Sequence, residues 1–385
     1  MMTDAADLRP DRRRLLQGAA AMVAAPFLNL GNHAVFAAAT GSQRTYSTRA
    51  VDLVKRATVI DMLAPLTIAD DDKILPKPLT EKMRADFMRS GVTAMHTAGG
   101  IGGPTAAEDT AGWIAAWSGF CGRNADTFSL VGTVADIDKA KAQGKIAVIM
   151  GCQNSDHFRK PQDVKNFYLA GQRVSQLTYN SQNLIGSGCT DRVDGGVSEF
   201  GAGIIKTMNE VGMLVDTSHC GDRTTIDAVA LSTKPIAITH ANCRAISGHP
   251  RAKPDEAIKA LGAKGGVMGI SDVRMFVSAK EPTKIDDIID HVDHVAKLIG
   301  VEHIGIGSDM DLYGYDSLSP EQTKILQSYY NGKYGFRAKS DVDDTSHPQR
   351  IYDVTEGLIR RGYSDANIIA ILGGNFHRLL SGIWV

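Results

Sequence analysis

The sequence predicts an α/β protein, a closed (β/α)8 barrel of the TIM type with extra C-terminal helices. Short, nearly continuous apolar runs, as expected of parallel strands buried on both faces, alternate with longer segments whose apolar residues recur every three or four positions. Eight such runs in succession favour a closed barrel over an open doubly wound sheet. No G-x-G-x-x-G motif follows the first run, which argues against a nucleotide-binding fold.

The expected strands are five to eight residues long, and several follow a Gly or Pro that ends the preceding helix. They are 58–62, 92–97, 146–153, 174–179, 213–219, 236–240, 266–271 and 303–309. The expected helices are 79–90, 106–125, 161–171, 199–211, 223–231, 254–261 and 285–299. After the last strand we expect a long excursion at 312–346 and two terminal helices, 348–361 and 364–372.

The first 39 residues have the features of a targeting leader. Arginines at 12–14 precede a weakly apolar stretch at 18–30, and small residues at 37–39 offer a signal-peptidase site. We therefore expect residues 1–39 to be a twin-arginine (Tat) signal peptide that is cleaved on export, which makes the mature protein periplasmic or secreted. An ordinary secretory signal and a disordered basic tail are the alternatives. Residues 40–385 would then form a single barrel domain.

The composition argues against several classes of function. A net charge of −1 gives no reason to expect binding to nucleic acid or to an anionic membrane surface. The apolar stretch in the leader is too short and too mild for a membrane span, which needs about 20 apolar residues. The five cysteines form no C-x-x-C pair, so we interpret them as buried thiols rather than as a zinc-ribbon or redox site.

Side chains that bind metals end three of the expected strands. His219 ends the fifth strand, His240 ends the sixth, and Asp309 ends the eighth. The C-terminal ends of the strands meet at one face of a (β/α)8 barrel, so these side chains can converge. Imidazole and carboxylate ligands with an open position are typical of catalytic zinc. The sequence therefore predicts a metal-dependent enzyme.

Five motifs follow one another around these strand ends. They are L-V-D-T-S-H at 214–219, P-I-A-I-T-H at 235–240, the loop 241–255, G-I-G-S-D-M-D at 305–311 and G-G-N-F at 373–376. In their order and spacing they resemble the membrane dipeptidase (renal dipeptidase) family, zinc peptidases of the amidohydrolase kind. The resemblance extends over about residues 55–380.

The resemblance implies roles for individual residues. His219 and His240 would bind one zinc ion, while Asp309 would belong to a second zinc and act as the acid and base of the reaction. Arg251 would hold the terminal carboxylate of the substrate, because a guanidinium can contact both carboxylate oxygens. The resemblance further implies a dipeptide or other small-molecule substrate and a homodimer.

Four positions depart from the family pattern. Leu63 and Pro65 stand where the family has a His and an Asp that bind zinc, and neither side chain can bind an ion. Gln153 stands where the family has a Glu that bridges the two zincs. Tyr179 replaces a His that steadies the reacting carbonyl, and its hydroxyl can donate a hydrogen bond to the developing oxyanion.

These departures predict one zinc rather than the two of typical family members. The ion would be held by His219 and His240, with Asp309, Gln153 or water completing its coordination. His96 and Asp61, at the ends of the second and first strands, are alternative replacement ligands.

Three functions are compatible with this pattern. The first is a metal-dependent hydrolase of dipeptides or related amides that uses metal-activated water, with Asp309 moving the proton. The second is a periplasmic tailoring enzyme that acts on a peptide-derived metabolite in the same chamber. The third is a non-catalytic binding or maturation protein whose metal site has decayed, and metal content would separate it from the other two.

Overall fold

The computed structural model describes residues 44–64, 77–328 and 337–384. The chain divides into two compact units, residues 1–52 and 53–385. Helix α3 (Thr48–Arg56) runs across the boundary between them. The expected leader at 1–39 lies outside the described residues, so its assignment stays a prediction. No helix of the three described ranges is long and apolar enough to cross a bilayer.

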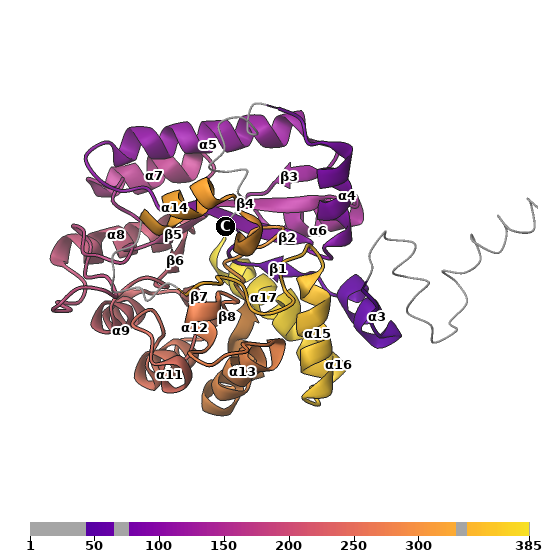
Figure 1. The fold of residues 1–385 in the computed structure, drawn as a ribbon. Helices are drawn as coiled ribbons and strands as arrows, with labels where there is room; N and C mark the ends of the chain where they lie inside the picture. The colour runs from indigo at the N-terminus through magenta and orange to yellow at the C-terminus, as the bar shows by residue number, and fades with distance from the viewer. Residues whose placement is uncertain (1–43, 65–76, 329–336, 385) are drawn as a thin grey trace, which may run out of the picture. The chain divides into compact units, whose positions relative to one another are not determined.

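The second unit contains the predicted closed barrel of parallel strands (Figure 1). The sheet order is β2-β1-β9-β8-β7-β6-β5-β4, and a pairing between β2 and β4 closes the ring. The strands are β1 (Ile60–Asp61), β2 (Ala94–Gly99), β4 (Ile146–Cys152), β5 (Val174–Gln176), β6 (Leu214–Asp216), β7 (Ala237–Ala241), β8 (Val267–Ile270) and β9 (Ile304–Ile306). Each predicted run overlaps one of these strands, which confirms the predicted (β/α)8 fold.

One strand and one helix between β2 and β4 were not predicted. Strand β3 (Phe128–Leu130) pairs with β4 outside the ring, and helix α6 (Val134–Ala142) follows it. The run in β3 is only three residues long and buries Phe128 alone, so its apolar pattern is too short to detect. The capping box of Thr133 and Asp136 is the signal that marks the start of α6.

The remaining helices surround the ring and largely follow the predicted order. They are α4 (Glu81–Arg89), α5 (Ala106–Arg123), α7 (Pro161–Leu169), α8 (Glu199–Val211), α9 (Asp222–Leu231), α11 (Asp255–Ala263) and α13 (Ile285–Ile299). Short helices α10 (Arg244–Ser247) and α12 (Arg274–Val277) lie in the loops after β7 and β8. The chain ends with α15 (Arg350–Arg360), α16 (Asp365–Ile369), the π-helical turn η6 (Ala370–Gly374) and α17 (Asn375–Ile383).

The interior of the barrel is filled with apolar side chains up to a polar layer at the C-terminal ends of the strands. Ile60, Ile149 and Leu214 belong to one buried cluster, which Phe376 of α17 joins. Gly305 makes room for that ring, because a Cβ atom there would lie 2.2 Å from it. The terminal helix α17 therefore packs into the barrel core and leaves the C-terminal strand ends for the functional side chains.

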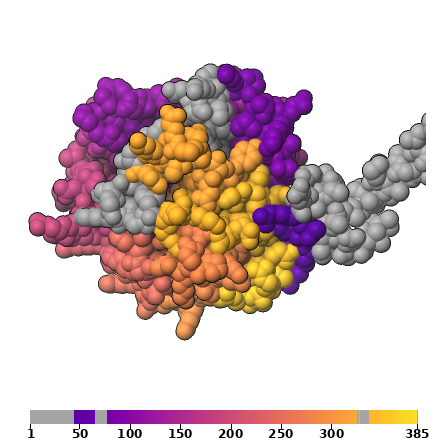
Figure 2. All heavy atoms as spheres, in the orientation of Figure 1, coloured from indigo at the N-terminus to yellow at the C-terminus, as the bar shows by residue number. Residues whose placement is uncertain are grey.

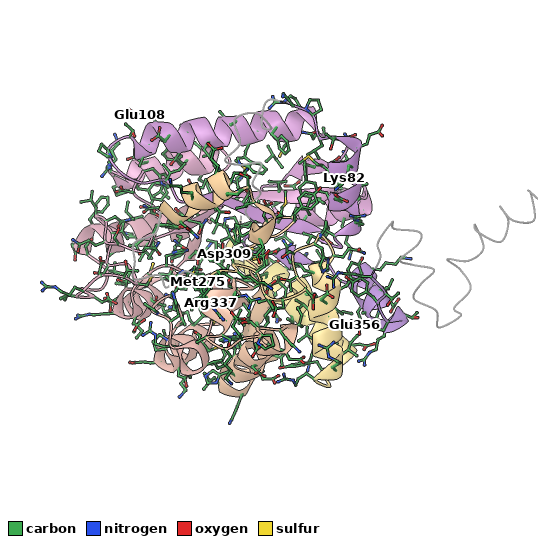
Figure 3. All side chains as sticks on the ribbon, in the orientation of Figure 1. Lys82, Glu108, Met275, Asp309, Arg337 and Glu356 are labelled. Carbon is green, nitrogen blue, oxygen red and sulfur yellow. The ribbon has the colours of Figure 1, made fainter. Side chains whose placement is uncertain are left out.

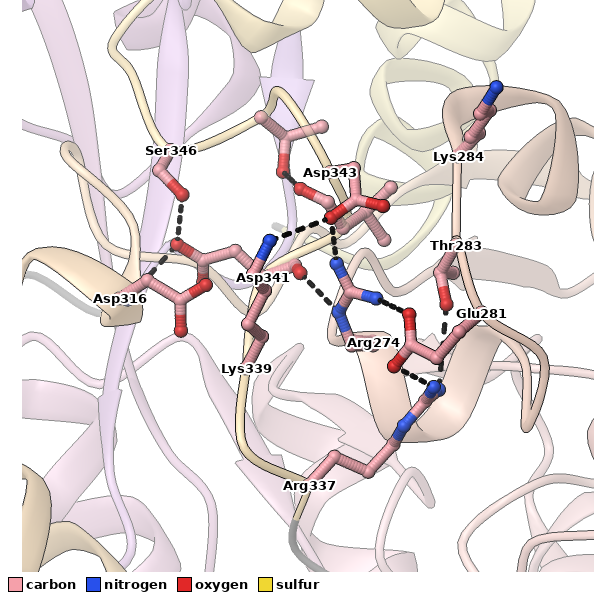
Figure 4. A network of polar contacts seen from close by, with 12 residues as sticks. Arg274, Glu281, Thr283, Lys284, Asp316, Arg337, Lys339, Asp341, Asp343 and Ser346 are labelled. Carbon is pink, nitrogen blue, oxygen red and sulfur yellow. Dashed lines mark hydrogen bonds and ion pairs between the residues drawn. The ribbon is translucent and has the colours of Figure 1, made fainter.

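The excursion after β9 forms the 3-10 turn η4 (Tyr315–Ser317) and helix α14 (Pro320–Ser328). In the space-filling view its orange residues lie across the middle of the face shown (Figure 2). The return segment, residues 337–346, is attached to the loop after β8 through the buried guanidinium of Arg274 (Figure 4). That guanidinium pairs with Glu281 and Asp343, and its Nε donates to the Asp341 carbonyl at 2.6 Å.

Candidate metal and substrate site

The two predicted histidine ligands face each other at the ends of neighbouring strands. His219 lies in the turn after β6, and His240 lies within β7. Their Nε2 atoms are 3.0 Å apart, and both side chains are buried. Two ligands of a tetrahedral zinc, each about 2.0–2.1 Å from the ion, are separated by roughly 3.3 Å. The spacing of the two nitrogens therefore fits a single metal ion.

The other ring nitrogens fix which atoms face inward. His219 Nδ1 is 2.6 Å from Asn180 Oδ1, an amide oxygen that can only accept, so Nδ1 carries the proton. His240 Nδ1 is 2.8 Å from Thr239 Oγ1. If His240 also carries its proton on Nδ1, two lone pairs face each other across 3.0 Å, an arrangement that a cation between them would stabilise. This is the donor arrangement that a metal requires.

The charges around the pair favour neutral imidazoles. Burial lowers the pKa of His219 well below its usual value, and the positive charges of Arg251 and Lys253 lower it further. Burial and the positive charge of Arg251 also lower the pKa of His240. Neutral imidazole is the form that binds metals, so the surroundings prepare both rings for that role.

Asp309 and Gln153 are the two remaining predicted ligands. Within residues 44–64, 77–328 and 337–384, no three His, Cys, Asp or Glu side chains form a group that could hold a metal. Gln153 is turned so that its Nε2 donates to the Ala98 carbonyl at 3.1 Å. Leu63 is buried, and its carbonyl accepts from the Asp309 backbone N–H at 2.8 Å. Pro65 lies outside the described residues. The roles of Asp309 and Gln153 as ligands stay predictions.

Asp309 has the properties of a proton carrier. It follows β9 and adopts a left-handed backbone with φ of 57°. In Figure 3 it lies near the middle of the ring of strands. Burial raises the pKa of its carboxyl to about 7, with Arg251 opposing and Asp61 adding to the rise. A carboxyl that titrates near neutral pH can both take up and release a proton.

Arg251 is a buried cation with no carboxylate partner in the part of the chain that the structure describes. Its Nη1 donates to the Ser218 carbonyl, and its Nη2 donates to the His240 carbonyl at 2.9 Å. Its Nε has no hydrogen-bond partner among these residues. Phe276 covers the guanidinium at 5.5 Å. Neutral carbonyls do not balance the positive charge of this guanidinium. A bound anion would balance it, which fits the predicted substrate carboxylate.

Tyr179 lies flat against His219, one of the two predicted ligands. Its ring stacks on His219 with centroids 4.2 Å apart and an interplanar angle of 21°. Gly100 also lies close to this ring, since a Cβ atom there would be 3.2 Å from it. The structure thus gives Tyr179 a packing contact with His219, while its predicted hydrogen bond to an oxyanion stays a prediction.

The alternative ligands His96 and Asp61 differ in how fully their side chains are hydrogen-bonded. His96 Nδ1 donates to the Met62 carbonyl at 2.7 Å, and its ring packs on Gly151. Its buried Nε2 has no hydrogen-bond partner among the described residues, so His96 as a replacement ligand stays a prediction. Asp61 accepts hydrogen bonds from the backbone N–H of Leu63 and from both the N–H and hydroxyl of Ser308. We therefore interpret Asp61 as a structural residue whose hydrogen bonds connect β1 to the end of β9.

Sequence reasoning missed the residues that orient the histidines. Asn180 and Thr239 contact their Nδ1 atoms, and Asn180 has a left-handed backbone with φ of 61°. Lys253 is buried, and its Nζ donates to the carbonyls of Thr217 and Cys220, both at 2.7 Å, on either side of His219. The signal available in the sequence was the position of Asn180 and Thr239 directly at predicted strand ends.

The comparison with known proteins settles the family. Residues 49–321 match the membrane dipeptidase family, peptidase family M19. The chain belongs to this family. Its members are metallopeptidases, and a metal cofactor, typically zinc, goes with that family.

Two curated relatives are dipeptidases. Dipeptidase verJ of Clonostachys rogersoniana is 32% identical over 265 residues, which are 68% of this chain and 61% of that protein. Dipeptidase tcpJ of Claviceps purpurea is 27% identical over 260 residues, 66% of this chain and 55% of that protein. The chain thus covers less than two thirds of either relative. A solved amidohydrolase structure from Pseudomonas aeruginosa is 27% identical, with a TM-score of 0.75 over 87% of this chain and 99% of that one.

Proposed function

We propose that this membrane dipeptidase family member is an exported zinc-dependent hydrolase of dipeptides or related small amides. The observation that carries the proposal is the pair of buried imidazoles whose Nε2 atoms are 3.0 Å apart and whose Nδ1 atoms are both engaged. Export by the Tat route to the periplasm or beyond and assembly as a homodimer belong to the same proposal, on the strength of the leader sequence and the family.

One zinc ion fits the residues present better than two. His219 and His240 would hold it, with Asp309, Gln153 or water completing the coordination. The second site of typical members has lost its first-strand ligands, because Leu63 is an apolar buried side chain. When bound, zinc supplies a water molecule whose pKa is lowered to about 7.

The chain's own residues would bind the substrate and move its proton. Arg251 is proposed to hold the free carboxylate of the dipeptide, an anion that its buried guanidinium lacks among the described residues. Asp309 would take a proton from the attacking water and return it to the leaving amine, as suits its pKa of about 7. Tyr179, beside His219, would donate a hydrogen bond from its hydroxyl to the developing oxyanion.

A tailoring reaction on a peptide-derived metabolite is the second candidate. It is favoured by the altered chamber, in which the Gln153 amide donates to a backbone carbonyl instead of a Glu bridging two ions. Such a chamber would keep the carboxylate-binding Arg251 but act on a substrate other than a free dipeptide.

A screen of dipeptides with zinc-loaded protein tests the proposal. Free dipeptides should be hydrolysed, and the same dipeptides with an amidated C-terminus should be poor substrates because they lack the anion that Arg251 needs. Absence of turnover across the panel would reject the dipeptidase function and favour the tailoring reaction. Equal turnover of free and amidated dipeptides would reject the role of Arg251 alone.

A further inference from the structure

The carboxylate of Asp216 joins the ends of β6 and β7 through hydrogen bonds. Its Oδ1 accepts hydrogen bonds from the Ser218 N–H at 3.0 Å, the Ser218 hydroxyl at 2.6 Å and the Thr239 N–H at 3.0 Å. Its Oδ2 accepts one hydrogen bond, from the Thr239 hydroxyl at 2.7 Å. Asp216 and Thr239 are fully or almost fully buried. Because a carboxylate only accepts, the hydrogen bonds from Ser218 and Thr239 all run toward Asp216.

The direction of these bonds determines the proton position on His240. The Thr239 hydroxyl has one proton, and the carboxylate at 2.7 Å is its strongest acceptor. Its oxygen is then left to accept from His240 Nδ1 at 2.8 Å. The proton of His240 must stay on Nδ1, and Nε2 is left with a lone pair that faces His219.

We propose that Asp216 and Thr239 form a hydrogen-bonded relay that holds His240 in its metal-binding tautomer. They are positioning residues, since neither Asp216 nor Thr239 provides one of the two facing nitrogens and both act through His240. The inference deepens the proposed function and rests on it, because the tautomer matters only if the two Nε2 atoms bind a metal. His219 is oriented differently, by the neutral amide of Asn180.

Breaking the relay has a specific consequence. Thr239→Val keeps the branched shape of the side chain but leaves His240 Nδ1 without an acceptor in a buried position. The unfavourable N–H is avoided if the proton moves to Nε2, which can then donate to His219 Nε2 at 3.0 Å. The two histidines are then hydrogen-bonded to each other, and a metal ion must break this hydrogen bond in order to bind.

Asp216→Asn reverses the relay with little change in volume. Three donors converge on the Oδ1 position, so the amide oxygen of the new side chain belongs there and its NH2 group faces Thr239. The Thr239 oxygen would then accept from this NH2 and direct its own proton to His240 Nδ1. The same tautomer change is expected as for Thr239→Val, by a different route.

The experiment measures the tautomer and the metal affinity separately. Zinc-free protein with 15N-labelled histidine reports which ring nitrogen of His240 is protonated, with the His240→Gln spectrum identifying its signals. Zinc affinity is measured by competition with a chelating dye. Thr239→Ser keeps the hydroxyl and should behave as the parent protein. Thr110→Val is the matched control, since the Thr110 hydroxyl on α5 is buried without a hydrogen-bond partner among the described residues.

We expect the Nδ1-protonated tautomer in the parent, Thr239→Ser and Thr110→Val proteins, and the Nε2-protonated tautomer in Thr239→Val and Asp216→Asn. Zinc affinity should fall about 10- to 100-fold in the last two, as for other residues that orient a metal-binding His. An unchanged tautomer in both variants, or an affinity within about twofold of the parent, would overturn the relay. A parent protein that shows the expected tautomers but binds no zinc would instead overturn the proposed metal site and leave the relay intact.

Discussion

Arg251 is the residue whose surroundings are most informative about the substrate. Its guanidinium is buried, and its hydrogen bonds among the described residues go to the carbonyls of Ser218 and His240. Arg251→Lys should raise KM for a dipeptide by at least about tenfold, because an ammonium cannot make the two-pronged contact with a carboxylate. The kcat should change less than KM. Steady-state kinetics on free and amidated forms of one dipeptide checks this, and an equal change for both forms would contradict it.

The pKa of Asp309 predicts how activity depends on pH. Burial raises that pKa to about 7, so the carboxyl is mostly protonated below this pH and ionised above it. If Asp309 accepts a proton from water, kcat/KM should fall about tenfold for each pH unit below 7. Asp309→Asn should lower kcat at least about 100-fold at every pH. A parent profile that is flat between pH 5 and pH 8 would exclude Asp309 as the base.

Arg274 anchors a whole element rather than the site itself. It is fully buried between Glu281 and Asp343 and holds the return segment, residues 337–346, beside α12 (Figure 4). Arg274→Met would remove both ion pairs and the hydrogen bond from Nε to the Asp341 carbonyl, so the substitution should free this segment. Hydrogen exchange in 337–346 should rise strongly while exchange in α13 stays the same.

A matched control for Arg274 is available on the surface. Arg360 pairs with Asp286 at 3.0 Å, with both side chains more than half exposed. Such pairs contribute about 0–1 kcal/mol, so Arg360→Met should leave exchange in 337–346 unchanged. Equal effects of the two substitutions, or no effect of Arg274→Met, would show that the ion pairs do not hold the segment.

At the scale of elements, long apolar segments were predictable and short or polar ones were not. The predicted helix at 285–299 coincides with α13, because apolar residues recur regularly along one of its faces. Strand β3, with one buried side chain, and helix α14 in the excursion lack such a pattern. The excursion is held in place by ion pairs such as Arg274 with Asp343. These two residues are far apart in the chain, so no local sequence pattern predicts their contact.

The same distinction holds for the candidate site. The sequence predicted that His219 and His240 converge, because strand order in a barrel determines which ends are neighbours. It did not predict the orientation of Gln153 or the contacts of Asn180 and Thr239. Those depend on side-chain hydrogen bonds between elements distant in the chain.

For the whole molecule, the central claim is a barrel that holds one zinc ion between two histidines. Elemental analysis of the purified, zinc-equilibrated protein tests it most directly. We predict about one tightly bound zinc per chain, lost in His219→Ala and in His240→Ala while thermal unfolding still shows a folded barrel. Two tightly bound zincs per chain, or zinc retained by either folded variant, would contradict the account.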